Sequence, residues 1–451
     1  ANSNIETYAN SNIETYANSH IFIRIGTFPT MGSYRQRCIE PYIEDNLEAF
    51  GAVLIVGPKW CGKTTTARRF AKTVVELANP QELRRYEEIA DIDVSLLFRG
   101  EKPILFDEWQ VIPELWDTIR YDVDKTGKFG EYILTGSTTV DRSEIRHSGA
   151  GRITTLKMTT MSLFESGDSN GEISLRQLFS GAVDSTSEST HTIQNIAKLI
   201  TRGGWPATID VKESTARLQL EGYCRTILQE QITAPDGKSR DPARMGQLLR
   251  SLARNESTEA ANTAILADVT NGGAHQMHIN TLVDYIRTLE SIYVVDDLPA
   301  WCPKLRSKTV VRTSPIRPFS DPAIGAFFLN ASANDLLQDP ETFGLYFESL
   351  VIRDLRAYAT PLGGQVLHYR DKSGLEADAI IHLSDGRWAA FEVRLGRGAI
   401  DSAAKHLLKL KERVDSEQEG DPAFLAVVTY TGFAYRRNDG VFVIPIGCLG
   451  P

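Results

Sequence analysis

The sequence lacks the features of a membrane-spanning, disulfide-linked or strongly basic chain. None of its apolar runs approaches the roughly 20 residues that a membrane helix requires, so the sequence predicts no spanning segment. Because 58 acidic residues outnumber 49 lysines and arginines, the net charge of −9 argues against a generally basic surface but leaves room for a local basic patch. Cysteines are few and far apart, which favours reduced thiols in a cytoplasmic protein over disulfides or zinc ligands. They are Cys38, Cys61, Cys224, Cys302 and Cys448.

The first 30 residues show a repeated polar pattern. Residues 1–8 (ANSNIETY) recur at 9–16, and a third copy begins at 17–19 before it diverges. A polar octad has no apolar face to bury, and repeat architectures use longer units in at least three copies. We therefore expect residues 1–30 to be a leader added for expression, with Met31 as the native start.

A complete phosphate-binding loop, G-x-x-x-x-G-K-[ST], follows the apolar run 53–56 and precedes a helix-compatible segment, 65–72. In this setting, glycines let backbone N–H groups converge on phosphate oxygens, and the helix N-terminus adds a positive dipole. Lys63 is expected to reach the β- and γ-phosphates, and the Thr64 hydroxyl to contact Mg²⁺. The sequence therefore predicts ATP and Mg²⁺ as cofactors. The candidate nucleotide-binding residues are Gly57, Pro58, Lys59, Trp60, Cys61, Gly62, Lys63, Thr64 and Thr65.

Two further apolar runs end in polar residues. The run 103–106 leads into Asp107 and Glu108, and the run 132–134 leads into Thr135 and Ser137. Short buried strands separated by helical stretches indicate a parallel sheet with crossover helices, so the expected fold class is α/β. Asp107 is expected to hold Mg²⁺ through water, and Glu108 to orient the attacking water. Ser137 or Thr135 is placed to sense the γ-phosphate, with a strand-end cap as the alternative.

Three downstream arginines, Arg142, Arg146 and Arg152, are candidates for a residue that acts on the nucleotide of a neighbouring subunit. Such an arginine neutralises charge on the transferring phosphoryl group and makes hydrolysis depend on oligomerisation. Arg152 is preferred because its flanking glycines indicate a defined loop. A solvated surface arginine is the alternative at each position.

These segments resemble a large prokaryotic family of AAA-type ATPases that pair this core with a C-terminal domain of unknown function. The resemblance extends through residues 51–64, 105–110, 134–137, 149–152, 161–165 and 202–206. It implies an AAA+ fold and a homo-oligomer, with a hexameric ring as the default, but no agreed biological role. The turn at 203–206 is similar to an element that lies beside adenine in related ATPases, and a simple domain-boundary turn is the alternative.

A helical region follows the expected ATPase core. Helices are expected at 245–253, 260–269 and 279–291, followed by a β-prone stretch at 292–295. The segment 301–319 then carries basic residues and no acidic residue, an order that resembles a winged helix-turn-helix. Its basic wing would contact DNA phosphates without reading sequence, and a lid or subunit-packing module is the alternative. The candidate DNA contacts are Lys304, Arg306, Lys308, Arg312 and Arg317.

The C-terminal part carries a spaced carboxylate pattern. Glu348 lies in an expected helix, Asp378 opens a strand, and Glu392 closes the next strand. This order resembles the PD-(D/E)xK nucleases, in which carboxylates on one face hold Mg²⁺. The lysine of that pattern is replaced by Arg394, which stays protonated and cannot accept a proton. We therefore expect a degenerate nuclease-like site, with active cleavage as the alternative.

The expected organisation is a leader (1–30), an AAA+ ATPase domain (31–212), a helical and winged-helix domain (213–330) and an α/β restriction-endonuclease-like domain (331–451). Three functions fit these parts. The first is an oligomeric ATPase coupled to DNA binding or remodelling, such as translocation or branch migration. The second is a nucleotide-gated signalling switch, and the third is an ATP-regulated DNA nuclease.

Overall fold

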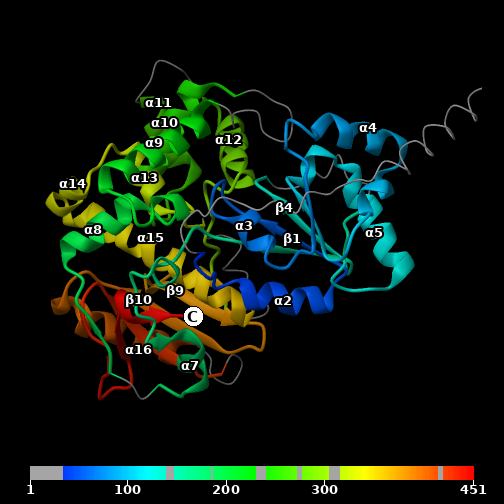
Figure 1. Ribbon diagram of the computed structural model, residues 1–451. Helices are drawn as coiled ribbons and strands as arrows, with labels where there is room; N and C mark the ends of the chain where they lie inside the picture. The colour runs from blue at the N-terminus through cyan, green and yellow to red at the C-terminus, as the bar shows by residue number, and fades with distance from the viewer. Residues whose placement is uncertain are drawn as a thin grey trace, which may run out of the picture.

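The computed structural model describes residues 34–138, 147–183, 186–229, 240–271, 277–303, 315–414 and 420–451. Within these ranges, a parallel sheet towards the N-terminus, a group of helices and a mixed sheet towards the C-terminus lie against one another (Figure 1). The five cysteines all lie in the described ranges and form no disulfide there. None of the helices in the described ranges has the length and apolar character needed to cross a bilayer.

The N-terminal sheet is wholly parallel, as the sequence predicts. Its order is β2-β3-β4-β1-β5, so strand β1 lies between β4 and β5. Every residue of β1 is buried, because helices cover both faces of the sheet. The carboxyl ends of the strands therefore meet at one edge. The strands are β1 (Ala52–Val56), β2 (Thr73–Glu76), β3 (Ile104–Asp107), β4 (Tyr132–Gly136) and β5 (Ile153–Lys157).

The α-helices described in this part of the chain are α2 (Glu40–Ala49), α3 (Lys63–Ala67), α4 (Leu83–Asp93) and α5 (Glu114–Thr126). The helix expected at 65–72 is wrong in its extent, because α3 ends at Ala67. Three consecutive β-branched threonines make this segment a poor helix former, and a turn at residues 68–70 leads towards β2.

The middle of the chain is helical. Buried leucines from several of its helices form one core, which includes Leu248 and Leu282. The three helices expected after residue 244 are present. The described residues on either side of 304–314 form isolated bridges, Val295–Phe319 and Leu298–Ile316 antiparallel and Ala300–His368 parallel. The helices are α8 (Ile193–Arg202), α9 (Glu213–Gln229), α10 (Pro242–Arg254), α11 (Asn262–Asn271), α12 (Ile279–Ser291), α13 (Pro322–Phe328) and α14 (Ala333–Gln338).

The C-terminal sheet is mixed and has helices on both faces. Its order is β13-β14-β11-β10-β9-β8, with antiparallel pairs among β8, β9 and β10 and parallel pairs among β10, β11 and β14. Helix α15 (Pro340–Ala359) packs with one set of strand side chains and α16 (Ile400–Arg413) with the other. The strands are β8 (Gly364–Arg370), β9 (Glu376–Leu383), β10 (Trp388–Val393), β11 (Phe424–Thr429), β13 (Tyr435–Arg436) and β14 (Phe442–Pro445).

Buried apolar residues within 163–179 and 196–200, which the sequence assigns to the ATPase domain, pack into the core of the C-terminal sheet. Two small pairings join them to the end of the chain: β6 (Ile173–Ser174) with β15 (Leu449–Gly450), and β7 (Glu188–Ser189) with β12 (Gly432–Phe433). The short helices α6 (Leu163–Ser166) and α7 (Leu175–Ser180) lie in the same stretch. The N-terminal and C-terminal parts therefore share a hydrophobic core.

Candidate nucleotide site

The phosphate-binding loop connects β1 to the N-terminus of α3. Two of its glycines have backbone angles that favour glycine, with φ of 148° at Gly57 and 103° at Gly62. A Cβ on Gly57 would lie 2.1 Å from the carbonyl oxygen of Met158. Trp60 also has a positive φ, of 65°, and its side chain is 62% exposed. The loop is thus held in a conformation that only part of its sequence adopts easily.

Lys63 points back into the loop. Its ammonium donates hydrogen bonds of 2.9 Å to the carbonyl oxygens of Gly57 and Pro58, and its side chain is buried. The cation therefore lies inside the curve of the loop, at the point where the motif places phosphate oxygens.

Two hydroxyl groups from different elements meet at one carboxylate. The Thr64 and Thr135 hydroxyls each donate a 2.6 Å hydrogen bond to Asp107 Oδ1. Adjacent hydroxyl and carboxylate oxygens are the donors that Mg²⁺ prefers, so Thr64 and Asp107 fit the cation that the loop implies. Groups of three His, Cys, Asp or Glu side chains able to hold a metal are absent from the described ranges, and Mg²⁺ bound mainly through phosphates and water needs no such group.

Glu108 follows Asp107 in a left-handed backbone conformation, with φ of 54°. Such strain in a non-glycine residue is typical of functional sites. The Ser137 hydroxyl donates to Glu108 Oε2 at 3.3 Å, and the Gln110 amide donates to the same oxygen. Of the two predicted sensors, Thr135 thus contacts Asp107 and Ser137 contacts Glu108. Gln110 was not predicted, although it lies within the motif that the sequence singles out.

Two residues outside the motif support the loop. The Trp205 indole donates to the carbonyl oxygen of Lys59 at 3.1 Å, so the turn at 203–206 lies against the loop. Arg37 donates to the carbonyl oxygen of Cys61 at 2.7 Å and pairs with Glu165 at 3.0 Å. Burial disfavours the charged form of Glu165, but Arg37 and backbone donors outweigh it and lower its pKa. No sequence motif marked Arg37, because its partners lie far along the chain.

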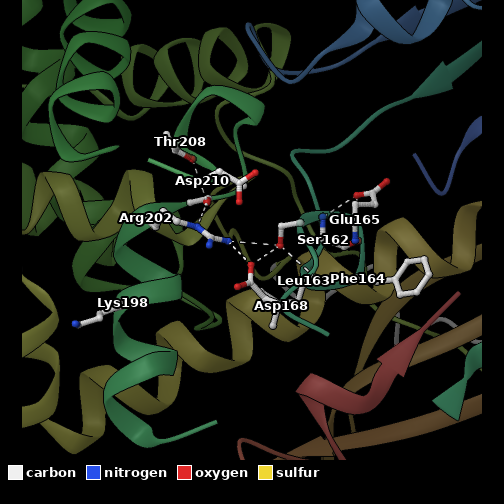
Figure 2. Close-up of polar contacts among 12 residues, drawn as sticks. Ser162, Leu163, Phe164, Glu165, Asp168, Lys198, Arg202, Thr208 and Asp210 are labelled. Atoms are coloured by element: carbon white, nitrogen blue, oxygen red, sulfur yellow. Dashed lines mark hydrogen bonds and ion pairs between the residues drawn. The ribbon is translucent and has the colours of Figure 1, made fainter. Parts of the chain in front are cut away.

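The turn is also anchored on its α8 side. Arg202 donates to Asp168 at 2.6 Å, and the Ser166 hydroxyl donates to the same carboxylate oxygen at 2.6 Å. Figure 2 shows Arg202 pointing towards Asp168, with Thr208 and Asp210 above it in the view. Arg35 extends the network, because it pairs with Asp210 at 2.6 Å. Hydrogen bonds and ion pairs therefore hold the segment after β5 against the turn beside the loop.

Residues 49–166 match a family model described as an AAA domain. Residues 49–166 are thus a P-loop ATPase domain. Residues 193–335 and 343–449 match models described as Domain of unknown function (DUF8612) and Domain of unknown function (DUF4143). A comparison with curated proteins found no match.

Two of the solved structures that match the chain are distant from it in sequence. A Walker-type ATPase of Pyrococcus abyssi is 13% identical with a TM-score of 0.40, covering 68% of this chain and 99% of that one. A structure of Drosophila ORC bound to DNA is 13% identical with a TM-score of 0.18, covering 72% and 100%. Scores this low carry no argument about the fold or function of this chain.

Arg152 lies at the opposite edge of the P-loop ATPase sheet from the loop. It directly precedes β5, which runs parallel to β1, whereas the loop follows β1. Its guanidinium pairs with Asp124 of α5 at 2.5 Å and is partly exposed. Arg152 therefore faces away from the nucleotide site of its own chain. Arg142 and Arg146 lie outside the described residues.

A buried charge network joins the P-loop ATPase domain to the other two parts. Asp321, at the start of α13, accepts from the Thr160 hydroxyl at 2.7 Å and from the Gly204 N–H at 2.9 Å. Arg353 of α15 donates to Asp321 at 3.2 Å and to Asp354 at 2.7 Å. Burial opposes the charge on Arg353, but the two carboxylates outweigh it and raise its pKa. The segment after β5, the turn beside the loop and α15 thus meet at the Asp321 carboxylate.

The predicted nuclease-like residues do come together, with Arg394 among the carboxylates. Arg394 donates to Asp378 at 2.9 Å and also to Glu392, and the Val393 N–H donates to Asp378 at 2.7 Å. Burial, followed by the charge of Asp378, raises the pKa of Glu348 and Glu392, while Arg394 acts in the opposite sense. The guanidinium therefore occupies the position between carboxylates where the sequence pattern places Mg²⁺.

The basic segment is described only at its end. Lys304, Arg306, Lys308 and Arg312 lie outside the described residues. Arg317 pairs with Asp297 at 3.5 Å, and its side chain is only 13% exposed. As a freely accessible phosphate contact, Arg317 is therefore the weakest of the five candidates.

One buried carboxyl group predicts a pH-dependent stability. Glu256 is fully buried and accepts from the Ser349 hydroxyl at 2.6 Å and from the Phe319 N–H at 3.2 Å. Burial raises its pKa to about 8. Since an unfolded glutamate titrates near pH 4.3, the native state holds a proton that the unfolded state has lost between these values. The contribution of Glu256 to the free energy of unfolding should therefore decrease by about 1.4 kcal/mol per pH unit as the pH rises from about 4.3 to about 8.

The check is urea unfolding of the wild type and Glu256→Gln between pH 5 and 9. The neutral amide resembles the protonated carboxyl, so the variant should lose this contribution and become relatively more stable as pH rises. Parallel profiles for the two proteins would show that Glu256 stays ionised in the native state.

Proposed function

We propose that this protein is an oligomeric ATPase that hydrolyses ATP with Mg²⁺ and couples hydrolysis to binding or remodelling of DNA. The observation that carries the ATPase part is the convergence of Thr64 and Thr135 on Asp107, beside Lys63 and Glu108. One edge of the sheet thus holds the phosphate-binding loop, the Lys63 ammonium, the oxygens of Thr64 and Asp107 that could bind Mg²⁺, and the Glu108 carboxylate that could orient water. This is the set of groups that phosphoryl transfer requires.

Each group has a distinct part in the proposed reaction. Lys63 leaves the loop carbonyls to bind phosphate oxygens, which are stronger acceptors because they are charged. Thr64 and Asp107 would hold Mg²⁺, which neutralises charge on the phosphates when bound. Glu108, fixed by Ser137 and Gln110, orients the attacking water for in-line displacement of the γ-phosphoryl group.

Oligomerisation is proposed from the position of Arg152. An arginine at the edge of the sheet opposite its own loop is suited to reach the nucleotide of a neighbouring copy, and a hexameric ring is the default assembly. DNA is proposed from the basic composition of 301–319 and from the nuclease-like carboxylate pattern. A signalling switch would use the same nucleotide site without DNA. An ATP-regulated nuclease is less favoured, because Arg394 lies between the carboxylates.

The test measures ATP hydrolysis at several protein concentrations, with and without duplex DNA. We expect the rate per subunit to rise with concentration and with DNA. Arg152→Ala should lose most of this rate while its ATP affinity stays unchanged, because an arginine in trans is worth about 10³–10⁵ in kcat. Arg120→Ala is the matched control, since Arg120 pairs with the same Asp124 from α5. A rate independent of concentration and DNA would instead support the signalling switch.

A further inference from the structure

A tight turn brings the side chain of Gln110 back to the carboxylate of Glu108. Glu108 has a left-handed φ of 54°, and the 3₁₀ turn η2 (Trp109–Val111) follows it directly. The Val111 N–H donates to the carbonyl oxygen of Glu108 at 3.1 Å and closes this turn. The Gln110 amide then donates a 2.5 Å hydrogen bond to Glu108 Oε2. A hydrogen bond to a carboxylate is roughly twice as strong as one between neutral groups.

The other end of the Gln110 amide has no protein partner. Because a carboxylate only accepts hydrogen bonds, the amide nitrogen must face Glu108 and the amide oxygen must face away from it. This oxygen is buried and accepts no hydrogen bond from the described part of the chain, and the buried indole N–H of Trp109 likewise donates none there. Buried polar atoms without a partner are uncommon in folded proteins. The contact with Glu108 therefore fixes the Gln110 side chain even though its oxygen stays unpaired.

Gly136, in the last position of β4, provides the space for both side chains. A Cβ on Gly136 would lie 3.1 Å from Gln110 Oε1 and 3.2 Å from Trp109 Nε1, so one of these neighbours would have to shift by a few tenths of an ångström. The backbone of Gly136 lies outside the left-handed region, so glycine is needed here for space alone. Trp109 is only 2% exposed, and its ring packs against that of Trp116. Gln110 is therefore the side chain that would shift.

We propose that Gln110 is a positioning residue, which holds the Glu108 carboxylate in place for the attacking water, and that Gly136 acts through Gln110 by leaving room for its amide. The inference rests on the proposed ATPase function and names two further residues on which the hydrolysis step depends. The Ser137 hydroxyl donates to the same oxygen, Glu108 Oε2, but at the longer distance of 3.3 Å. Since both donors bind Oε2, the Oε1 atom of Glu108 is left to accept a hydrogen bond from water.

The experiment measures ATP affinity at equilibrium and the rate constant of single-turnover hydrolysis with Mg²⁺. It compares the wild type, Gln110→Met, Gly136→Ala and the variant that carries both substitutions. Methionine keeps the length of glutamine but has no N–H to donate, and Gln110→Leu replaces it if Gln110→Met folds poorly. The matched controls, Gln219→Met and Gly222→Ala, lie on α9. The Gln219 amide oxygen also has no partner in the described ranges, and a Cβ on Gly222 would meet no atom within 4 Å.

We expect Gln110→Met to hydrolyse ATP about 10- to 100-fold more slowly with unchanged ATP affinity, the loss typical of one hydrogen bond to a charged group. Gly136→Ala should slow hydrolysis about three- to tenfold, since a misplacement of about 1 Å can cost about 100-fold. The double variant should be no slower than Gln110→Met, because Gly136 has then lost the residue through which it acts. Both controls should behave like the wild type.

The opposite results are equally clear. A wild-type rate in Gln110→Met would overturn the inference and leave the ATPase function intact. A loss of ATP affinity as large as the loss of rate would also overturn it, because Gln110 would then support the fold of the site and not the hydrolysis step. Effects that multiply in the double variant would show that Gly136 does not act through Gln110. A wild type that hydrolyses no ATP with Mg²⁺ would overturn both the inference and the proposed ATPase function.

Discussion

Lys63→Ala should lose ATP binding, with affinity lower by about 100-fold or more. The ammonium would make two charge-assisted hydrogen bonds to phosphate oxygens, each worth about 1.5–3 kcal/mol.

Glu108→Gln should keep ATP affinity but lower kcat by about 10²–10⁴. An amide cannot accept a proton from the attacking water as a carboxylate does. Lys63→Ala thus tests ATP binding, and Glu108→Gln tests the hydrolysis step.

Both measurements use labelled ATP, with equilibrium binding followed by single-turnover hydrolysis. Lys72→Ala is the matched control for the first variant, since Lys72 is exposed beyond α3. Glu114→Gln, at an exposed position on α5, is the control for the second. Normal turnover by Glu108→Gln would assign water orientation to another group, and Ser137 and Gln110 would be the next residues to test.

The parts of the fold and site that sequence predicts are those with local determinants. The phosphate loop is contiguous, and Asp107 and Thr135 follow buried apolar runs. Because parallel strands end at the same edge, their meeting at 2.6 Å follows from the predicted sheet. The predicted extent of α3 was wrong, because the low helix propensity of three β-branched threonines outweighs the helix-compatible residues that follow them.

Contacts between distant segments had no such signal. Arg37 meets the carbonyl oxygen of Cys61 only because the folded chain brings residue 37 under the loop. The segment after α6 joins the C-terminal sheet region through the pairing of β6 with β15 and of β7 with β12. Strands of two residues are too short to leave a recognisable pattern in the sequence. Arg394 was predicted to replace a lysine, but its position between Asp378 and Glu392 depends on side-chain geometry.

Helix α15 gives the three parts of the molecule a physical connection. Arg353 reaches the segment that follows β5 and the turn beside the phosphate loop, through Asp321 and Asp354. One turn further, Arg356 pairs with Asp296 at 2.8 Å, and Lys157 of β5 pairs with the same carboxylate at 2.6 Å. A shift of the strand edge during the nucleotide cycle would therefore act on the helix that also carries Glu348.

Arg353→Met should destabilise the protein by about 3–5 kcal/mol, the usual cost of removing one partner from a buried ion pair. The side chain is 3% exposed, and its loss would leave Asp321 and Asp354 buried without their cation. Arg356→Met is the matched control on the same helix. It should cost much less, because Asp296 keeps Lys157 and is itself partly exposed. Urea unfolding followed by tryptophan fluorescence compares the two variants.

A second substitution separates charge from packing. If uncompensated charge is the cause, Arg353→Met combined with Asp354→Asn should recover a large part of the lost stability, because a neutral amide costs less to bury than a carboxylate. The amide oxygen of asparagine can still accept the hydrogen bond that Asp354 accepts from the Leu163 N–H. The opposite outcome is that Arg353→Met and Arg356→Met are equally stable and that the double variant recovers nothing. Arg353 would then contribute by packing alone, and its ion pairs with Asp321 and Asp354 would add no stability.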